Sequence, residues 1–319
     1  MYHGIMNVYK EAGFTSHDVV AKLRGICKQK KIGHTGTLDP DAVGVLPVCL
    51  GSGTKLCDML TGETKEYIAR FRLGITTDTQ DISGKVLEEK EVGVCEEQVR
   101  EMLSHFVGEL QQVPPMYSAL KVGGKKLYEL AREGKEVERK ARLITVYELE
   151  LLKAEHPEYE IRVTCSKGTY IRTLCHDVGQ ALSCGAVMTS LVRSRVGEFR
   201  LKDAKTLSAL QELAGQGRLQ EAVIPVEEMF RALPAIQVSD GAQKALLNGN
   251  QLKQSEILVK EDTESPGKIS KEFPVDQGEY RVYSSDGWFC AIYRYERGRK
   301  LFTPVKMFLE GQDGSDADH

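Results

Sequence analysis

The chain has 319 residues, of which 41% are hydrophobic and 28% charged, and its formal net charge is −3 at pH 7. This length can hold two domains with sizeable cores, and the composition is that of an ordinary globular protein. No run of about 18 apolar residues occurs, and residues 1–5 lack the layout of a signal peptide, so we expect a cytoplasmic protein without a transmembrane helix.

Periodic patterns of apolar residues define elements in the first part of the chain. Apolar residues recur at helical spacing over 15–29, behind hydroxyl residues that can cap the helix, and again over 96–110. The continuous apolar run at 45–50 predicts a buried strand. In 67–73 apolar and polar residues alternate, which predicts a strand with one buried face.

The next part of the chain continues this mixture of strands and helices. We predict strands at 145–152 and 160–166, paired with each other, a helix over 169–182 and a strand at 190–197. Because the elements lack a regular βαβ alternation, we expect an α+β domain over 1–232 on a mixed, largely antiparallel sheet.

From residue 233 the sequence changes character. The pattern predicts a short helix at 241–247, a polar loop at 260–271 and strands at 280–283, 288–295 and 300–308. We therefore expect a small β-rich domain over 233–310, followed by a disordered acidic tail at 311–319.

The small net charge hides local clusters of charge. Acidic residues crowd 81–110 and the C-terminal tail, whereas basic clusters include Lys121 with Lys125 and Lys126, and Arg193 with Arg195 and Arg200. Such basic clusters can form a positive surface track for phosphates. The eight cysteines form no C-x-x-C pair and no Cys/His spacing typical of zinc, so we expect reduced thiols and no metal site.

The most informative segment is 33–51, which reads GHTGTLDPDAVGVLPVCLG. Gly33 and Gly36 allow a tight turn or the close approach of a bulky ligand. Pro40 stiffens the chain directly after Asp39, so that this carboxylate projects from a fixed position. Taken alone, the tetrad Thr-Leu-Asp-Pro is also typical of a helix N-terminus, which Asp39 would merely cap.

The complete segment resembles the signature of the TruB family of tRNA pseudouridine synthases, whose catalytic aspartate occupies the position of Asp39. Further segments match motifs of this family in the family's order, and these are 10–20, 65–84, 114–134, 166–174 and 191–199. Two departures are Glu11, where proline is usual, and Gly53, where alanine is commoner.

The resemblance implies an enzyme that converts the T-loop uridine of tRNA, at position 55, to pseudouridine without metal or organic cofactor. It implies a PUA-like RNA-binding domain at the C-terminus and a monomeric protein. The segment 114–134 resembles that of the bacterial stand-alone enzymes, so we expect no guide RNA and no obligate protein partner. An RNA arm hides the target bond, and the nucleotide must therefore be extruded into a pocket.

The resemblance also implies the catalytic residues. Asp39 would act as nucleophile or anionic stabiliser. Arg172 would hold it through a bidentate pair that keeps the carboxylate ionised. Tyr67 would stack on the uracil and serve as acid or base at carbon 5, and Leu191 would line the pocket. Without the resemblance, Tyr67 and Leu191 would be core residues and Arg172 a surface arginine.

Three further residues are candidates for contact with RNA. The resemblance implies that His34 enters the T loop and helps to displace the target nucleotide, whereas a loop histidine is otherwise usually solvated. Tyr117 and Lys121 lie in a basic segment that contains glycine and aromatic residues and is suited to gripping an RNA backbone.

Three alternative functions remain open. A relative that works with guide RNA and protein partners would share the fold. An RNA chaperone would bind and release tRNA with Asp39 dispensable. A glycosidase would use Asp39 and Asp41 as a carboxylate pair, although no sugar-binding aromatic platform accompanies them. Within the favoured function, addition to the base and a sugar-centred route both remain possible.

Overall fold

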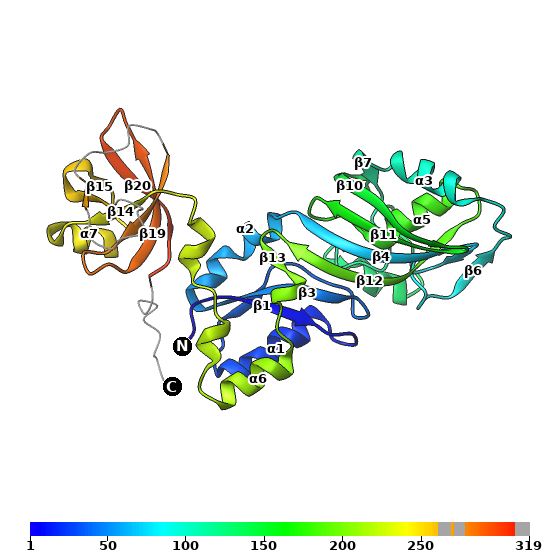
Figure 1. Cartoon of the computed structure of the whole chain (residues 1–319), viewed down its shortest axis with the longest axis horizontal. Coiled ribbons are helices and arrows are strands. Elements are labelled where there is room, and N and C mark those ends of the chain that lie inside the picture. The colour runs from blue at the N-terminus through cyan, green and yellow to red at the C-terminus, as the bar shows by residue number, and fades with distance from the viewer. Residues whose placement is uncertain (261–268, 271–277, 310–319) are drawn as a thin grey trace.

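The computed structural model describes residues 1–260, 269–270 and 278–309 of the chain. Two β-sheets lie side by side along the long axis of the molecule (Figure 1). A nine-stranded sheet is built from residues before Leu201, and a seven-stranded sheet is built from residues after Pro234. This arrangement confirms the α+β class with a β-rich C-terminal domain.

The nine-stranded sheet is mixed and largely antiparallel, as predicted. Its main path is β1 (Gly4–Lys10), β3 (Val43–Leu50), β12 (Ala186–Val196), β4 (Lys65–Leu73), β11 (Glu158–Cys165), β10 (Arg142–Glu155) and β7 (Gly108–Gln112). Two short strands, β2 (Ile32–His34) and β13 (Phe199–Arg200), pair with β3 and β12. Only the β12–β3 pair in this sheet is parallel among the described strands. The predicted pairing of β10 with β11 is confirmed.

Helices cover the nine-stranded sheet in two groups (Figure 1). Helices α1 (Ser16–Cys27) and α6 (Leu207–Gly215) pack against each other and share a buried apolar cluster with β1 and β3. Helices α3 (Glu96–Ser104) and α5 (Ile171–Ala181) share a second cluster with β4, β10, β11 and β12. Shorter elements are α2 (Cys57–Gly62), α4 (Leu127–Arg132), β5 (Ile75–Thr77), β6 (Val86–Glu89), β8 (Lys121–Val122) and β9 (Lys125–Lys126).

The helix predicted over 96–110 is wrong after Ser104. Helix α3 ends at Ser104, and Gly108–Gln112 forms β7 at the edge of the sheet, paired with β10. Gly108 has a φ of 107°, which a helix cannot accommodate. Phe106 and Leu110 are partly buried against the apolar cluster that α3 and α5 share with the sheet, so their helical spacing reflects this packing rather than a helix.

The C-terminal sheet has its own core. Its strand order is β15 (Leu252–Lys253), β20 (Leu301–Met307), β19 (Phe289–Glu296), β18 (Glu279–Tyr283), β14 (Ala235–Val238), β16 (Ile257–Lys260) and β17 (Ile269–Ser270). The three predicted strands correspond to β18, β19 and β20, and the predicted short helix to a 3₁₀ turn at Asp240–Ala242 followed by α7 (Gln243–Leu247). Most of the loop predicted at 260–271 and the tail predicted at 311–319 lie outside the described residues. Ile269–Ser270, inside that predicted loop, is a strand.

An apolar cluster connects the two sheets. It contains buried residues of both, namely Ile5, Val45 and Val196 from the first sheet, Ile292 from the second, and Val226 and Phe308 beside them. No helix in the described ranges is long and apolar enough to cross a bilayer.

Candidate active site

The loop that carries Asp39 joins β2 to β3 and is held by buried polar contacts. Thr35 donates a backbone and a side-chain hydrogen bond to the carbonyl of Pro47, at 3.2 Å each. The backbone N–H of Leu38 donates to Ser16 Oγ at 3.0 Å. The chain after Asp39 enters strand β3 rather than a helix, so Asp39 is not a helix cap.

Lys10 fixes the part of the loop that follows Asp39. Its side chain is fully buried, and Nζ donates to the carbonyl oxygens of Glu11 at 3.1 Å, Pro40 at 2.9 Å and Ala42 at 2.6 Å. Burial lowers the pKa of Lys10 to about 8, against the opposing effect of Asp39. Asp39 therefore projects from a segment that cannot shift without breaking buried hydrogen bonds.

Arg172 in the first turn of α5 contacts Asp39. Arg172 Nη2 lies 3.2 Å from Asp39 Oδ1 and 2.6 Å from the carbonyl oxygen of Tyr117. Arg172 Nη1 lies 3.4 Å from Asp81 Oδ2 and 3.5 Å from the carbonyl oxygen of Thr79. The expected bidentate pair is therefore wrong, because the two ends of the guanidinium contact two different aspartates.

Asp81 is a member of the site that sequence reasoning missed. Its Oδ1 accepts hydrogen bonds from Thr79 Oγ1 at 2.7 Å and from Ser83 Oγ at 2.5 Å, which leaves Oδ2 for Arg172. Asp81 lies in the segment 65–84, which matches a motif of the family, and this match is the feature of the sequence that could have pointed to it. A single sequence does not say which acidic residue of that segment faces the arginine.

The ionisation of Asp39 is set by opposing influences. Desolvation raises its pKa above the ordinary value of an aspartate, and the nearby Asp81 acts in the same direction. The charges of Arg172 and Lys10 lower this pKa and offset part of the effect. The carboxylate is thus available in its ionised form only above a raised pKa.

Tyr67 and Leu191 form an apolar wall beside this carboxylate. Tyr67 is paired on both sides, with Val163 of β11 and Arg193 of β12, and is 8% exposed. Leu191 is also 8% exposed, and both residues share one apolar cluster with Leu38, the neighbour of Asp39. Desolvation raises the pKa of the Tyr67 phenol, whereas the Arg193 charge lowers it.

His34 lies at the end of β2, at the entrance to the same loop. Its ring meets that of His17 edge-on, with 5.0 Å between the centroids. The N–H of Gly36 donates to His34 Nδ1 at 3.3 Å. Burial, assisted by His17 and Arg193, lowers the pKa of His34, so the imidazole is held neutral.

The two residues predicted to contact the RNA backbone, Tyr117 and Lys121, differ in their exposure to solvent. Tyr117 is half-buried and contacts the site through its carbonyl oxygen, whereas Lys121 lies exposed in the β8–β9 hairpin.

Arg193 does not belong to the basic surface cluster in which the sequence places it. Arg193 is 1% exposed, because its guanidinium hydrogen-bonds to backbone carbonyls inside the domain.

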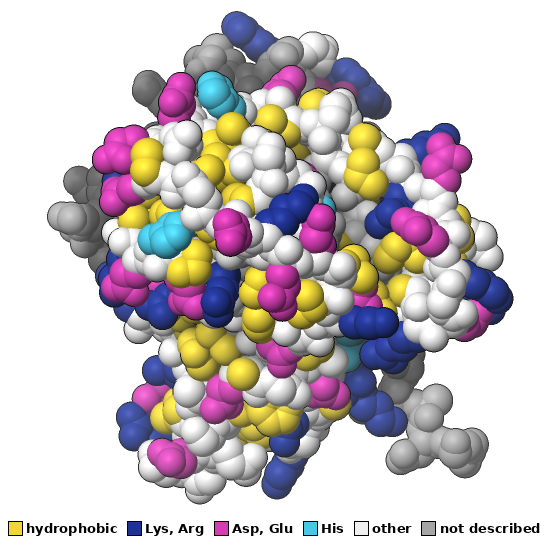
Figure 2. All heavy atoms as spheres, turned by 90° about the vertical axis from the view of Figure 1, so that its right-hand side faces the viewer, with side chains coloured by type: hydrophobic (Ala, Val, Ile, Leu, Met, Phe, Trp, Pro, Cys, Tyr) yellow, Lys and Arg dark blue, Asp and Glu magenta, His cyan; other side chains and the backbone are white. Residues whose placement is uncertain are grey.

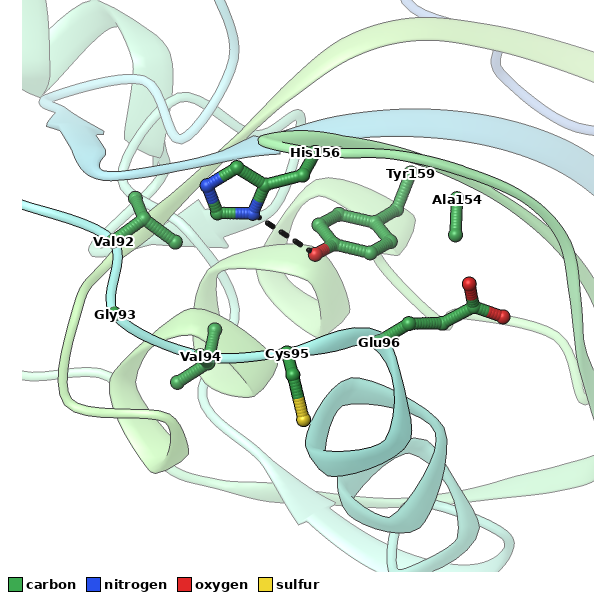
Figure 3. A pocket seen from close by; sticks show the side chains of 8 residues that line it. All are labelled: Val92, Gly93, Val94, Cys95, Glu96, Ala154, His156 and Tyr159. Atoms are coloured by element: carbon green, nitrogen blue, oxygen red, sulfur yellow. Dashed lines mark hydrogen bonds between the residues drawn. The ribbon is translucent and has the colours of Figure 1, made fainter.

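Two hollows elsewhere contain none of the predicted site residues. One, of about 350 Å³, is bounded by 92–96 and by the turn between β10 and β11, where His156 Nδ1 lies 3.4 Å from the Tyr159 hydroxyl (Figure 3). The other, of about 490 Å³, lies between the two sheets beside Trp288.

At the end of the molecule that carries β6 and α3, acidic and basic side chains are intermingled (Figure 2). Among the described residues, no group of three or more His, Cys, Asp or Glu could hold a metal ion.

Family models account for most of the first domain. The model described as TruB family pseudouridylate synthase, N-terminal domain, matches residues 24–171. The model described as tRNA pseudouridylate synthase B C-terminal domain matches residues 172–231. The border between them falls at Arg172, so the two matched segments together supply Asp39, Tyr67 and Arg172 to one site.

Curated bacterial proteins are similar in sequence to nearly the whole chain. The tRNA pseudouridine synthase B of Lachnoclostridium phytofermentans is 49% identical over 315 residues, which covers 96% of this chain and 100% of the relative. That of Clostridium novyi is 44% identical over 300 residues, covering 94% of this chain and 98% of the relative.

Solved structures share the fold over the same length. A Cbf5-Nop10-Gar1 complex contains a chain with a TM-score of 0.68 and 28% identity, covering 96% of this chain and 85% of that chain. A chain of an H/ACA RNP bound to a substrate RNA containing 2′-deoxyuridine has a TM-score of 0.67 and 26% identity, covering 97% and 86%. The matched family models, the near-complete relatives and the Asp39–Arg172 site agree, and this chain therefore belongs to the TruB family of pseudouridylate synthases.

Proposed function

We propose that this protein isomerises the T-loop uridine at position 55 of tRNA to pseudouridine, with Asp39 as the central catalytic residue. The observation that carries the proposal is the contact between a buried arginine and a partly open aspartate. The Arg172 side chain is 7% exposed and the Asp39 side chain 40% exposed, at 3.2 Å. A carboxylate held from behind and open in front suits attack on a bound nucleotide.

The reaction requires the glycosidic bond of the uridine to break and the base to rejoin the ribose through carbon 5. Asp39 either adds to the base at carbon 6 or stabilises and captures the sugar at C1′. In both routes the proton on carbon 5 leaves, and N1 gains one from solvent or an acid. Arg172 keeps the Asp39 oxygens oriented throughout, because its other contacts are to Asp81 and to backbone carbonyls.

The residues around Asp39 have separate roles in binding the nucleotide and moving its proton. Tyr67 stacks on the extruded uracil and accepts the proton from carbon 5 through its hydroxyl. Leu191 lines the pocket next to Tyr67, as part of the same apolar wall. His34, held neutral, enters the T loop in place of the extruded nucleotide. A neutral imidazole fits between bases with less desolvation cost than an imidazolium.

RNA binding extends beyond the catalytic pocket. Tyr117 and Lys121 contact the backbone of the T arm, supported by the exposed position of the lysine. We place the catalytic domain at 1–232 and a PUA-like RNA-binding domain at 233–310, and the end of the second matched family model at residue 231 supports this border. The protein works in the cytoplasm as a monomer, without cofactor, guide RNA or obligate partner.

The test is nucleoside analysis of tRNA transcripts incubated with the purified protein. We expect one pseudouridine per unmodified tRNA, and none in a matched transcript that carries cytidine at position 55. Pseudouridine at a different uridine would overturn the assignment of the site in tRNA. Strong binding of tRNA without any pseudouridine would favour the chaperone alternative, and cleavage of an oligosaccharide would favour the glycosidase.

A further inference from the structure

Arg193 is a buried charged residue that the proposed mechanism does not use. It lies on β12, at the centre of the nine-stranded sheet, and only 1% of its surface is exposed. Its backbone passes so close to β3 that a Cβ on Gly44 would lie 2.3 Å from the Arg193 carbonyl oxygen. Placing a guanidinium here costs free energy that its partners must offset.

The partners of Arg193 are backbone carbonyls of the catalytic loop and of the strand after it. Nε donates to the Val45 carbonyl at 2.7 Å, and Nη1 donates to the Thr37 carbonyl at 3.4 Å. Arg193 Nη2 has no hydrogen-bond partner within the described part of the chain, and no carboxylate there pairs with Arg193. A buried arginine that has no ion-pair partner and leaves one nitrogen without a hydrogen bond is unusual in a folded protein, which indicates a functional role.

Tyr67 is the group that faces this guanidinium. Arg193 and Tyr67 are direct partners across the antiparallel pair of β12 and β4, so their side chains lie on the same face of the sheet. The phenol and the guanidinium are close enough for each to affect the ionisation of the other. Arg193 thus lies behind Tyr67, whereas Arg172 lies behind Asp39.

Other charged and titratable groups surround the pair from several elements. Lys10 of β1, Lys65 of β4 and His34 of β2 lie near Arg193, and Asp39 of the loop and Cys165 of β11 lie near Tyr67. Burial lowers the pKa of both lysines to about 8, and His34 is neutral. Arg193 is the cation placed directly across from Tyr67, and its guanidinium does not lose its proton in proteins, so it is the positive charge next to the phenol.

We infer that Arg193 is a positioning residue that prepares Tyr67 to accept the proton from carbon 5, through its buried charge directly across the β12–β4 pair from the phenol. The inference rests on the proposed function. In this step the C5–H bond breaks and its electron pair forms the C5–C6 double bond, either as the Asp39 carboxylate leaves carbon 6 or as the C6–N1 π electrons pass to N1, which gains a proton. The proton from carbon 5 passes to the Tyr67 phenolate. The phenol then releases that proton to solvent. Arg193 stabilises the phenolate without touching the substrate.

The experiment compares Arg193→Met with wild type, with 3,5-difluorotyrosine introduced at position 67 in both backgrounds. Fluorination makes the phenol more acidic, so it replaces the effect of the missing charge. We expect Arg193→Met to lower kcat by about 10- to 100-fold, with KM for T-arm RNA little changed and the pH–rate profile moved to higher pH. Difluorotyrosine should restore most of the lost rate in the variant and little in wild type.

Two further variants keep the test decisive. Arg195→Met removes a half-exposed arginine from the same strand and should leave the pH–rate profile unchanged. If Arg193→Met does not fold, Arg193→Lys retains a charge but loses the planar donors, and rescue by difluorotyrosine is then measured in that background. A folded variant with the wild-type profile, or a lowered rate that difluorotyrosine leaves unchanged, would overturn the inference. An inactive wild type would instead overturn the proposed function.

Discussion

Arg172 approaches Asp39 from the interior of the protein, with 3.2 Å between Nη2 and Oδ1, and leaves the other side of the carboxylate open. The arginine is itself fixed by Asp81 and by the carbonyl oxygens of Thr79 and Tyr117. The contact is therefore a rigid support for a reactive group rather than a surface ion pair.

Replacing Arg172 by lysine should impair catalysis far more than substrate binding. A lysine ammonium is a point charge and cannot reach four acceptors that surround a planar guanidinium. We expect Arg172→Lys to lower kcat about 100-fold and the free energy of unfolding by about 1–3 kcal/mol. Single-turnover kinetics and chemical denaturation measure the two effects. A variant with wild-type kcat would contradict the supporting role of Arg172.

Replacing Asp81 by asparagine should change the pH dependence of the reaction. The Asp81 charge raises the pKa of Asp39, so its removal lowers that pKa. Activity requires ionised Asp39 and is lost as the pH falls through this pKa. The acidic limb of the kcat profile should therefore move to lower pH in Asp81→Asn, while kcat at neutral pH falls because Arg172 is less firmly held.

A matched control for this variant lies three residues away. Asp78 Oδ1 accepts a hydrogen bond from the backbone N–H of Lys85 at 2.8 Å, and among the described residues Asp78 makes no hydrogen bond with Arg172. Asp78→Asn should keep the acidic limb of wild type. A shift in Asp78→Asn equal to that in Asp81→Asn would point to a general charge effect and contradict the prediction.

Replacing Tyr67 by phenylalanine separates stacking from proton transfer. Phenylalanine keeps the ring that faces the base but removes the hydroxyl, so RNA binding should stay within about twofold while kcat falls by about 100-fold or more. Filter binding and single-turnover rates on the same RNA test this. If binding and rate fall together, the hydroxyl serves binding or packing instead.

Replacing Gly44 by alanine should destabilise the domain. Gly44 has a φ of 112°, and a Cβ there would lie 2.3 Å from the Arg193 carbonyl oxygen. We expect Gly44→Ala to lower the free energy of unfolding by about 3 kcal/mol. Gly25→Ala is the control, since Gly25 is exposed in α1 with open space around it, and this change should raise stability by about 0.5–1 kcal/mol. Urea denaturation distinguishes the two.

Local patterns predicted much of the fold. The alternation at 67–73 identified both strand β4 and its buried face, because period-two burial is written directly into adjacent residues. The same logic failed after Ser104, where Phe106 and Leu110 continue the helical spacing although Gly108 turns the chain into an edge strand. Tertiary packing partly buries these residues without a helix.

The sequence predicts only those site residues that the family resemblance implies, such as Asp39, Tyr67 and Arg172. The contact between Arg172 and Asp81 joins residues 91 positions apart, and no local pattern indicates it. Arg193 was expected on the surface because charged residues are usually exposed, yet carbonyls of two other segments bring it inside. Asp81 and Arg193 can be recognised as members of the site only when the β5–β6 loop, β4, β12 and α5 are placed together.

The role of Asp39 as the central catalytic residue is tested by tritium release from a T-arm RNA whose uridines carry tritium at carbon 5, with wild type beside Asp39→Asn. We expect release by wild type and none by Asp39→Asn, while both proteins bind the RNA equally well. Equal release by the two proteins would contradict the central role of Asp39.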